Sequence, residues 1–353
     1  MKEEKVSSQY MVQLDALRAF AVGAVIVHHF VPGALEGGGY IGVKLFFCIS
    51  GFLITGILLK ARKDADENKY TRKELLWKFY VRRFLRIFPL YYLVIGVTFA
   101  INLDPVRKIL VWLLSYTLNI HMAAQGWYEL YFSHFWSLAV EEQFYIFWPW
   151  IILFLKREWL LPAIISIIFV GPLYRLSYVV SHYENMTALS TYISTFSSLD
   201  HLGFGSLLAL LVSKKNKSLL SEYSYLFFLF STVLYFGITN YMNNDVNLVL
   251  ADSVTAIIFC CIIYWMSQRV DKPLAHILEW KPLLYMGRIS YGLYVYHPFM
   301  PFLAIWLLLK FGIQAELYSF PVVSIALVLT IMISSVSWHF FEKPINDLKK
   351  HFV

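Results

Sequence analysis

A histidine, two adjacent glutamates and a tyrosine stand at the start of an apolar segment that runs on to Leu155. At 3.6 residues per helical turn, Glu141 and Tyr145 fall on the same helical face as His134. Glu142 points about 100° away from that face. Ionisable side chains in a membrane-crossing segment usually face the bundle interior or a water-filled cavity, so these residues are candidates for chemistry. The alternative is a helix end at the membrane surface with both glutamates hydrated.

The first apolar segment carries a charge pair and, further along the same face, an imidazole. Asp15 lies three residues before Arg18, and His29 lies eleven residues after Arg18. The helical rise places His29 about 16 Å from Arg18, near the middle of a hydrocarbon core about 30 Å thick. The same rise places Glu141 about 10 Å below His134, at a depth similar to that of His29. We therefore expect His29 and Glu141 to be close neighbours; a single buried histidine is otherwise a packing residue.

Two further groups of residues suit a phosphate-bearing, elongated ligand. Arg82, Arg83 and Arg86 precede the third apolar segment, and guanidinium groups bind phosphates through paired hydrogen bonds. Their other reading is anchoring on anionic lipid. In the second segment, Ser50 and Gly51 leave room for a thin ligand, although small residues in membranes also serve close helix packing.

The ninth apolar segment places Ser290, Tyr294 and His297 on one face, followed directly by Pro298. Proline frees a backbone carbonyl and can kink the helix into a cavity. Tyrosines near a membrane surface are also typical of an interfacial belt, which is the alternative for Tyr294. The histidines of the chain lack the spacing of helical zinc ligands, so no metal site is expected.

The composition is that of an integral membrane protein. Of the 353 residues, 59% are hydrophobic and only 15% are charged, whereas a soluble domain has about 25% charged residues. The net charge of +7 does not indicate nucleic-acid binding, because the cationic residues stand between apolar runs and report orientation in the membrane. Cys48, Cys260 and Cys261 lie within apolar runs and are expected to be small core hydrophobes.

Apolar runs long enough to cross a bilayer predict an all-α bundle of about ten transmembrane helices. They fall at about 14–34, 40–60, 87–103, 136–155, 158–180, 196–213, 222–241, 247–267, 289–311 and 318–340.

The distribution of cationic residues predicts that the N- and C-termini are both cytoplasmic. With ten spans, most of the 30 Lys and Arg residues fall on the inner side. The stretch 77–88 is amphipathic and is expected to form an interfacial helix before the third span. The segment 104–133 is expected outside, where it either re-enters the membrane or lies on its surface. The whole chain, 1–353, is expected to form a single membrane domain.

Five motifs spread over nearly the whole chain can be read together. They are 14–19 (LDALRA), 46–55 (FFCISGFLIT), 82–91 (RRFLRIFPLY), 136–145 (WSLAVEEQFY) and 289–297 (ISYGLYVYH). In this order they resemble the acyltransferase-3 family of bacterial membrane acyltransferases.

The resemblance implies transfer of an acyl group, usually acetyl, from cytoplasmic acyl-CoA to a hydroxyl of a surface glycan or its lipid-linked precursor. It also implies the bacterial inner membrane as location, with membrane lipids as surroundings and no nucleic acid as partner. The family's arginine, histidine and carboxylate match Arg18, His29 and Glu141. His29 would act as general base or, alternatively, as a transient acyl carrier, with Glu141 orienting it. Some members carry a fused esterase-like domain, which is not expected in this chain.

Two other classes of function remain open from the sequence. A proton-coupled transporter or exporter would use His29, Glu141 and His297 as a proton relay. A non-catalytic lipid-binding scaffold would use none of them. Binding and slow hydrolysis of acetyl-CoA would separate the acyltransferase from both.

Overall fold

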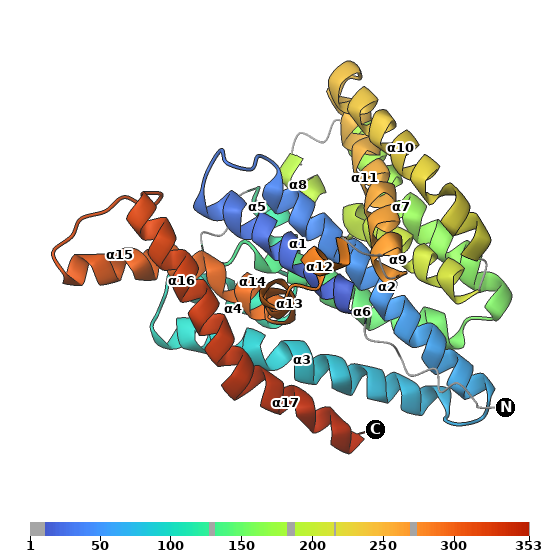
Figure 1. Ribbon diagram of the computed structural model, residues 1–353, viewed down its shortest axis with the longest axis horizontal. Coiled ribbons are helices and arrows are strands. Elements are labelled where there is room, and N and C mark those ends of the chain that lie inside the picture. Colours follow the sequence, from blue (N-terminus) through green and yellow to red (C-terminus); the bar gives the residue numbers. More distant parts are fainter. Residues whose placement is uncertain (1–10, 127–130, 182–187, 215–216, 269–273, 353) are drawn as a thin grey trace.

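The computed structural model of the protein describes residues 11–126, 131–181, 188–214, 217–268 and 274–352. Every regular element in these ranges is helical, so the predicted all-α fold is confirmed for this part of the chain. Figure 1 shows long helices packed side by side, with the hairpin of α10 and α11 at one edge and α16 at another.

The helices follow one another with short connections. In order they are α1 (Val12–Phe30), α2 (Gly38–Asp66), α3 (Arg72–Ala100), α4 (Val106–Leu114), α5 (Leu118–Gln125), α6 (Phe135–Phe154), η1 (Arg157–Trp159), α7 (Leu160–Ser181), α8 (Ala188–Ile193), α9 (Thr195–Ser213), α10 (Lys217–Tyr241), α11 (Asn244–Ser267), α12 (Leu274–Leu278), α13 (Lys281–Arg288), α14 (Ser290–Tyr296), η2 (His297–Phe299), α15 (Met300–Lys310), α16 (Phe320–Ser337), η3 (Trp338–Glu342), α17 (Lys343–Asp347) and η4 (Leu348–Phe352).

Seven of the helical segments in the described ranges are long and apolar enough to cross a membrane. They are Gly38–Asp66, Arg72–Ala100, Arg157–Ser181, Thr195–Ser213, Asn244–Ser267, Ser290–Lys310 and Phe320–Phe352. The other three predicted spans fall on α1, α6 and α10, which are helices of 19, 20 and 25 residues. The chain is thus a multi-span helical membrane protein.

The third predicted span differs from the expectation in where it begins. α3 is one continuous helix from Arg72, and the stretch 77–88 is its first half instead of a separate interfacial helix. Pro89 lies inside this helix. A capping box explains the early start, because the Thr71 side chain accepts from the Glu74 amide at 3.2 Å while Glu74 accepts from the Thr71 amide at 2.7 Å.

The segment after α3 folds back onto the bundle as the two short helices α4 and α5. The hydroxyl of Tyr91 donates to the carbonyl of Leu113 at 2.8 Å. Gln143 in the α6 motif donates to the carbonyl of Tyr116 at 2.8 Å and to Asn119 at 3.0 Å. The glutamine of the motif therefore fixes α6 to its neighbours.

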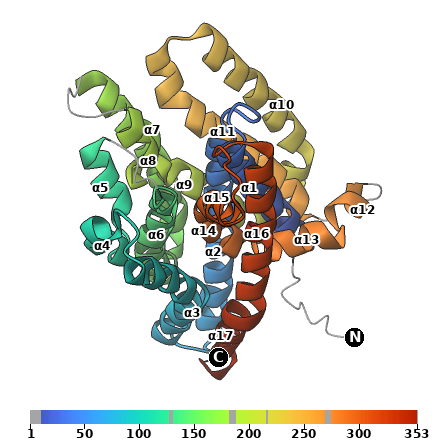
Figure 2. The same ribbon diagram turned by 90° about the vertical axis from the view of Figure 1, so that its left-hand side faces the viewer.

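Small residues bring α2 into close contact with α1 on one side and with α9 on the other (Figure 2). A side chain at Gly51 would collide with the backbone carbonyl of Leu202 in α9, and one at Gly205 would collide with the carbonyl of Cys48 in α2. Gly51 therefore serves helix packing, the alternative that the sequence left open for it.

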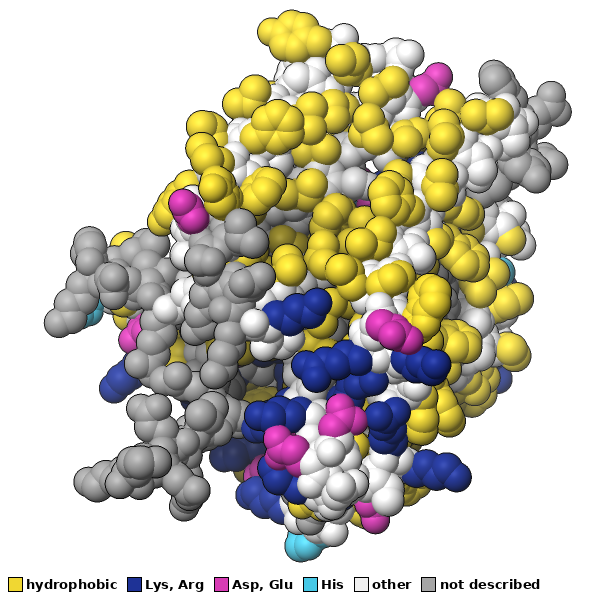
Figure 3. All heavy atoms as spheres, turned by 90° about the vertical axis from the view of Figure 1, so that its right-hand side faces the viewer, with side chains coloured by type: hydrophobic (Ala, Val, Ile, Leu, Met, Phe, Trp, Pro, Cys, Tyr) yellow, Lys and Arg dark blue, Asp and Glu magenta, His cyan; other side chains and the backbone are white. Residues whose placement is uncertain are grey.

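The surface is covered by large apolar side chains, as expected where helices face lipid. Figure 3 shows hydrophobic side chains over most of one face and Lys and Arg side chains gathered at one end of it. In α10, Tyr225, Phe230 and Val233 are each more than 60% exposed. Such exposure is stable in a bilayer and unstable in water.

The packing of α2 on α9 predicts that Gly51 tolerates no side chain. Gly51→Ala should destabilise the purified protein by about 1–3 kcal/mol, because overpacking a close contact forces backbone shifts. The matched control is Gly56→Ala in the same helix, where an added methyl group meets nothing within 4 Å. Thermal unfolding in detergent measures the difference, and equal melting temperatures for the two variants would contradict the packing.

Candidate active site

A cavity of about 110 Å³ lies where α1, α2, α3, α6 and α14 meet. We call it the arginine cavity because Arg18, Arg83 and Arg86 line it. Arg18 is paired with Asp15 at 3.0 Å. Within the described part of the chain, neither Arg83 nor Arg86 makes an ion pair or a hydrogen bond. The cavity therefore holds two cations without an ion-pair or hydrogen-bond partner among the described residues.

The carboxylate of the α6 motif lies in the same cavity. Glu141 accepts a hydrogen bond from the hydroxyl of Ser50, and Ser50 in turn accepts one from Tyr145 at 2.9 Å. The guanidinium of Arg83 lies 5.4 Å from the centre of the Tyr145 ring. The face of α6 that carries Glu141 and Tyr145 thus forms one wall of the arginine cavity.

A second cavity, of about 310 Å³, lies between the end of α1, the start of α2 and the start of α6. We call it the histidine cavity because His28, His29 and His134 line it. Tyr40 and Tyr192 form part of its wall. His29 is exposed to this space, whereas His134 is buried, with 4% of its surface exposed.

Pro298 determines which ring nitrogen of His297, buried behind this cavity, carries the hydrogen. Pro298 has no N–H, so the carbonyl of Tyr294 loses its helical partner. The ring Nδ1 of His297 lies 2.7 Å from that carbonyl. Because a carbonyl only accepts, Nδ1 of His297 carries the hydrogen and its Nε2 is an acceptor. This is the freed carbonyl that the sequence predicts, and a side chain in the same turn uses it.

The second histidine of the pair is held in one tautomer by these contacts. The Nδ1 of His29 lies 2.9 Å from the carbonyl of Val25 and 3.3 Å from the Nε2 of His297. Both neighbours accept, so Nδ1 of His29 is the donor and its Nε2 has a free lone pair. Among the described residues this Nε2 has no partner. His29 therefore presents a base to the histidine cavity.

His134 supplies a second acceptor in the same cavity. Its Nε2 lies 3.2 Å from the carbonyl of Val295, so Nε2 donates and Nδ1 accepts. In the described part of the chain, this Nδ1 is buried without a hydrogen-bond partner. Leaving a buried acceptor unpaired costs about 1–3 kcal/mol. Such an atom is typical of a site that a ligand's hydroxyl completes.

Only two residues, Val43 and Tyr294, line both cavities as the structure describes them. The hydroxyl of Tyr294 donates to the carbonyl of His134 at 2.9 Å and lies 2.6 Å from the Ser137 hydroxyl. These bonds hold the tyrosine across the boundary between α14 and α6. Val43 of α2 and Tyr294 of α14 thus stand between the arginines of one cavity and the histidines of the other.

The structure divides the residues singled out from the sequence into distinct places. Arg18, Arg83, Arg86, Ser50, Glu141, Ser290 and Tyr294 line the arginine cavity, and His29, His134 and Tyr294 line the histidine cavity.

The remaining candidates line neither cavity. Asp15 pairs with Arg18, Gly51 packs on α9, and Arg82 is exposed. Glu142 and His297 are buried, the latter against His29. His29 and Glu141 were expected as close neighbours, but they line separate cavities and bond to other partners: His29 to His297, and Glu141 to Ser50. Matched depth does not determine which way two helices face.

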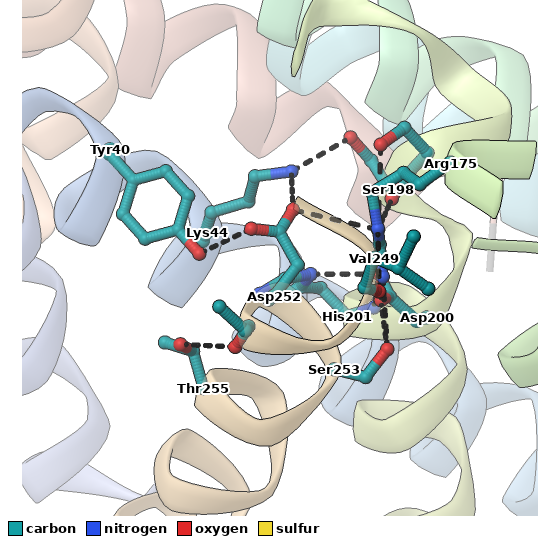
Figure 4. A network of polar contacts seen from close by, with 12 residues as sticks. Tyr40, Lys44, Arg175, Ser198, Asp200, His201, Val249, Asp252, Ser253 and Thr255 are labelled. Atoms are coloured by element: carbon teal, nitrogen blue, oxygen red, sulfur yellow. Dashed lines mark hydrogen bonds and ion pairs between the residues drawn. The ribbon is translucent and has the colours of Figure 1, made fainter. Parts of the chain in front are cut away.

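Sequence reasoning missed a buried ionic network beside the histidine cavity (Figure 4). Arg175 of α7 donates to Asp200 of α9 at 2.7 Å and to the carbonyls of Ser197 and Val249 at 2.7 and 3.2 Å. These bonds supply the anion and carbonyls that a buried arginine requires.

A second ion pair in the network ties α2 to α11. Lys44 lies 3.0 Å from Asp252, whose other oxygen accepts from the Tyr40 hydroxyl at 2.6 Å. The signal in the sequence was the presence of Asp200 and Asp252 within apolar runs.

The family follows from comparison with known proteins. The acyltransferase-3 model, described as an acyltransferase domain, matches residues 11–339. The chain belongs to this family. The resemblance predicted from its five motifs is therefore confirmed. No solved structure was found that matches this chain.

Similar curated proteins of the family are bacterial. The chain is 29% identical over 378 residues to O-acetyltransferase OatA of Staphylococcus aureus strain NCTC 8325 / PS 47, covering 99% of this chain and 59% of OatA. It is 28% identical over 373 residues to the putative peptidoglycan O-acetyltransferase YrhL of Bacillus subtilis strain 168, covering 96% of this chain and 55% of YrhL. The chain thus spans little more than half the length of these relatives.

Proposed function

We propose that this protein transfers an acyl group, most simply acetyl, from cytoplasmic acyl-CoA to a hydroxyl group of a cell-surface glycan. One observation carries the proposal. A cavity with two unpaired arginines meets a cavity with an unprotonated imidazole nitrogen at Tyr294 and Val43. A donor with phosphates at one end and a reactive carbonyl at the other fits this order of groups.

The arginine cavity suits the donor. Arg83 and Arg86 would bind the phosphates of CoA, because each lacks a partner in the described protein and a guanidinium binds phosphate through paired hydrogen bonds. Arg18 would add a third cation, partly neutralised by Asp15. The negative charge of Glu141 would partly neutralise the arginines. Its hydrogen bond with Ser50 fixes one wall of the cavity. The thin pantetheine arm would pass Ser50 and Tyr294 toward His29.

The chemistry requires one base at the meeting point. The acceptor hydroxyl attacks the acyl carbonyl carbon while the Nε2 of His29 takes its proton. The carbon–sulfur bond breaks, and the CoA thiolate leaves and receives the proton from the imidazolium. The products are an ester and free CoA. His297 and the carbonyl of Val25 hold Nδ1 of His29 throughout, so they position the base without touching the substrate.

The proposed orientation has ten spans with both termini in the cytoplasm. The seven segments named above would be seven of these spans, and α1, α6 and α10 would be the other three. The cationic residues then lie mostly inside, as the positive-inside rule requires. This arrangement places the arginine cavity toward the cytoplasm and the histidine cavity toward the outside. We propose the bacterial cytoplasmic membrane as the location, because the relatives are bacterial.

We propose peptidoglycan, or a lipid-linked precursor of it, as the acceptor. The support is the printed name of the Bacillus relative, a putative peptidoglycan O-acetyltransferase, together with the acyltransferase family. The proton relay of a transporter would need Glu141 near His29, whereas these residues line separate cavities.

Removal of the unpaired arginines should weaken donor binding. The double variant Arg83→Ala/Arg86→Ala is expected to bind acetyl-CoA about a hundredfold less tightly or worse, because hydrogen bonds to charged groups contribute about 1.5–3 kcal/mol each. Lysine at both positions should restore binding only in part, since an ammonium lacks the planar fork. Titration calorimetry measures the affinities. Arg82→Ala is the control, because Arg82 lines neither cavity, and equal affinity in wild type and double variant would contradict the assignment.

Loss of the proposed base should stop transfer without stopping donor binding. His29→Ala is expected to lower the rate of acetyl transfer about 10²–10⁴-fold, the usual contribution of a general base. Acetyl-CoA affinity should stay unchanged, because His29 lines only the histidine cavity. His339→Ala, which removes an exposed imidazole outside both cavities, is the control. A well-expressed His29→Ala protein that still transfers acetyl at the wild-type rate would overturn the proposed mechanism.

A further inference from the structure

A third pocket, of about 350 Å³, lies between α10 and α11 and reaches α2, α7 and α8. We call it the amide pocket because Asn244 and Asn247 line it. Its volume lies in the range of small-molecule sites. We propose that the amide pocket binds the part of the glycan acceptor that lies beside the acylated sugar. This inference rests on the proposed function and names the substrate contact that the function leaves open.

The amide pocket adjoins the histidine cavity. Tyr40 and Tyr192 line both spaces, and their rings stack with centres 6.0 Å apart and planes 28° from parallel. A glycan whose reacting hydroxyl meets His29 would therefore reach the amide pocket past this pair of rings. Aromatic rings combine an apolar face with a polar edge, which suits the apolar faces and hydroxyl rims of sugars.

The side-chain amides of the pocket have donors and acceptors that are available to a ligand. Among the described residues, the side chains of Asn244 and Asn247 have no hydrogen-bond partner. Each side chain offers two donors and an acceptor oxygen, so it can pair with adjacent sugar hydroxyls. Thr239 of α10 lines the opposite wall. By contrast, a larger cavity of about 530 Å³ beside α3 and α15 is lined almost wholly by apolar side chains, which suits lipid.

The charges at the pocket favour a neutral ligand. Arg175 and Asp252 line it, but each is already paired: Arg175 with Asp200 at 2.7 Å and Asp252 with Lys44 at 3.0 Å. The arginine cavity differs, because its Arg83 and Arg86 are unpaired in the described structure. An anionic ligand therefore gains less in the amide pocket than a polyhydroxylated one.

The same ion pairs make the pocket walls rigid. They connect α2, α7, α9 and α11 through the buried side chains of Lys44, Arg175 and Asp200 and the partly buried Asp252 (Figure 4). Breaking a buried pair by removing one partner is costly, so the walls keep their positions. A site fixed before the ligand arrives loses less freedom on binding.

Acceptors of different length test the proposal. The purified full chain is supplied with acetyl-CoA and either a peptidoglycan-derived tetrasaccharide or its single sugars. Asn244→Ala/Asn247→Ala should raise the KM for the tetrasaccharide about tenfold, on the order expected for two lost hydrogen bonds. The KM for single sugars should change less than about twofold, because they do not reach the pocket. Asn240→Ala removes a neighbouring exposed amide outside the pocket and is the matched control.

A binding measurement separates failure of this inference from failure of the proposed function. Thermophoresis of His29→Ala protein with the tetrasaccharide should show affinity that Asn244→Ala/Asn247→Ala weakens about tenfold. If the wild type transfers acetyl but the double variant keeps the same KM and the same affinity, the amide pocket is overturned and the proposed function stands. If the double variant binds the tetrasaccharide more weakly but the wild type transfers no acetyl, the proposed function is overturned and the amide pocket stands. A KM raised equally for all acceptors, or absence of both transfer and binding, overturns the pocket.

Discussion

Charged and polar groups inside this bundle need protein partners, because lipid offers no hydrogen bonds. The ionic network of Lys44, Arg175, Asp200 and Asp252 meets that requirement with two ion pairs. The arginine cavity does not meet it, since Arg83 and Arg86 have no partner within the described chain. The first set therefore holds helices together, and the second awaits an anion. This difference between paired and unpaired cations supports the assignment of the donor site.

The same constraint explains how a base is prepared inside the membrane. Pro298 removes one backbone donor, His297 replaces it at the carbonyl of Tyr294, and the remaining nitrogen of His297 faces His29. Each contact fixes the next tautomer, so His29 keeps its Nε2 unprotonated toward the cavity. About one helical turn before Pro298, Tyr294 lies at the boundary between the cavities and donates to the carbonyl of His134. One short stretch of α14 and η2 thus supports both the base and the boundary.

Much of this arrangement could be predicted from the sequence, because it depends on order along a helix. The helical segments, the Asp15–Arg18 pair and the carbonyl freed by Pro298 follow from spacing and residue type. The neighbours of His29 could not be predicted in the same way. Rise along an axis gives depth, but it does not give the rotation or the packing partner of a helix. His29 therefore meets His297, although Glu141 was expected.

Tertiary contacts limited the prediction of the other sites as well. Gly51 is suitable for a ligand or a helix, and only the position of Leu202 in α9 decides for the helix. The amide pocket combines residues from six helices, and more than half of the chain separates Tyr40 from Asn247 in the sequence. No local pattern marks such a pocket. The acidic residues within apolar runs were the available signal, and they indicated buried partners without naming them.

The central claim is that donor and acceptor reach His29 from opposite sides of the membrane. Vesicles containing the protein in one orientation test it most directly, with acetyl-CoA sealed on the side of the arginine cavity and a peptidoglycan-derived tetrasaccharide on the other side. We expect acetylated saccharide only when the two substrates are on these opposite sides. Equal acetylation with both substrates confined to the arginine side would contradict it.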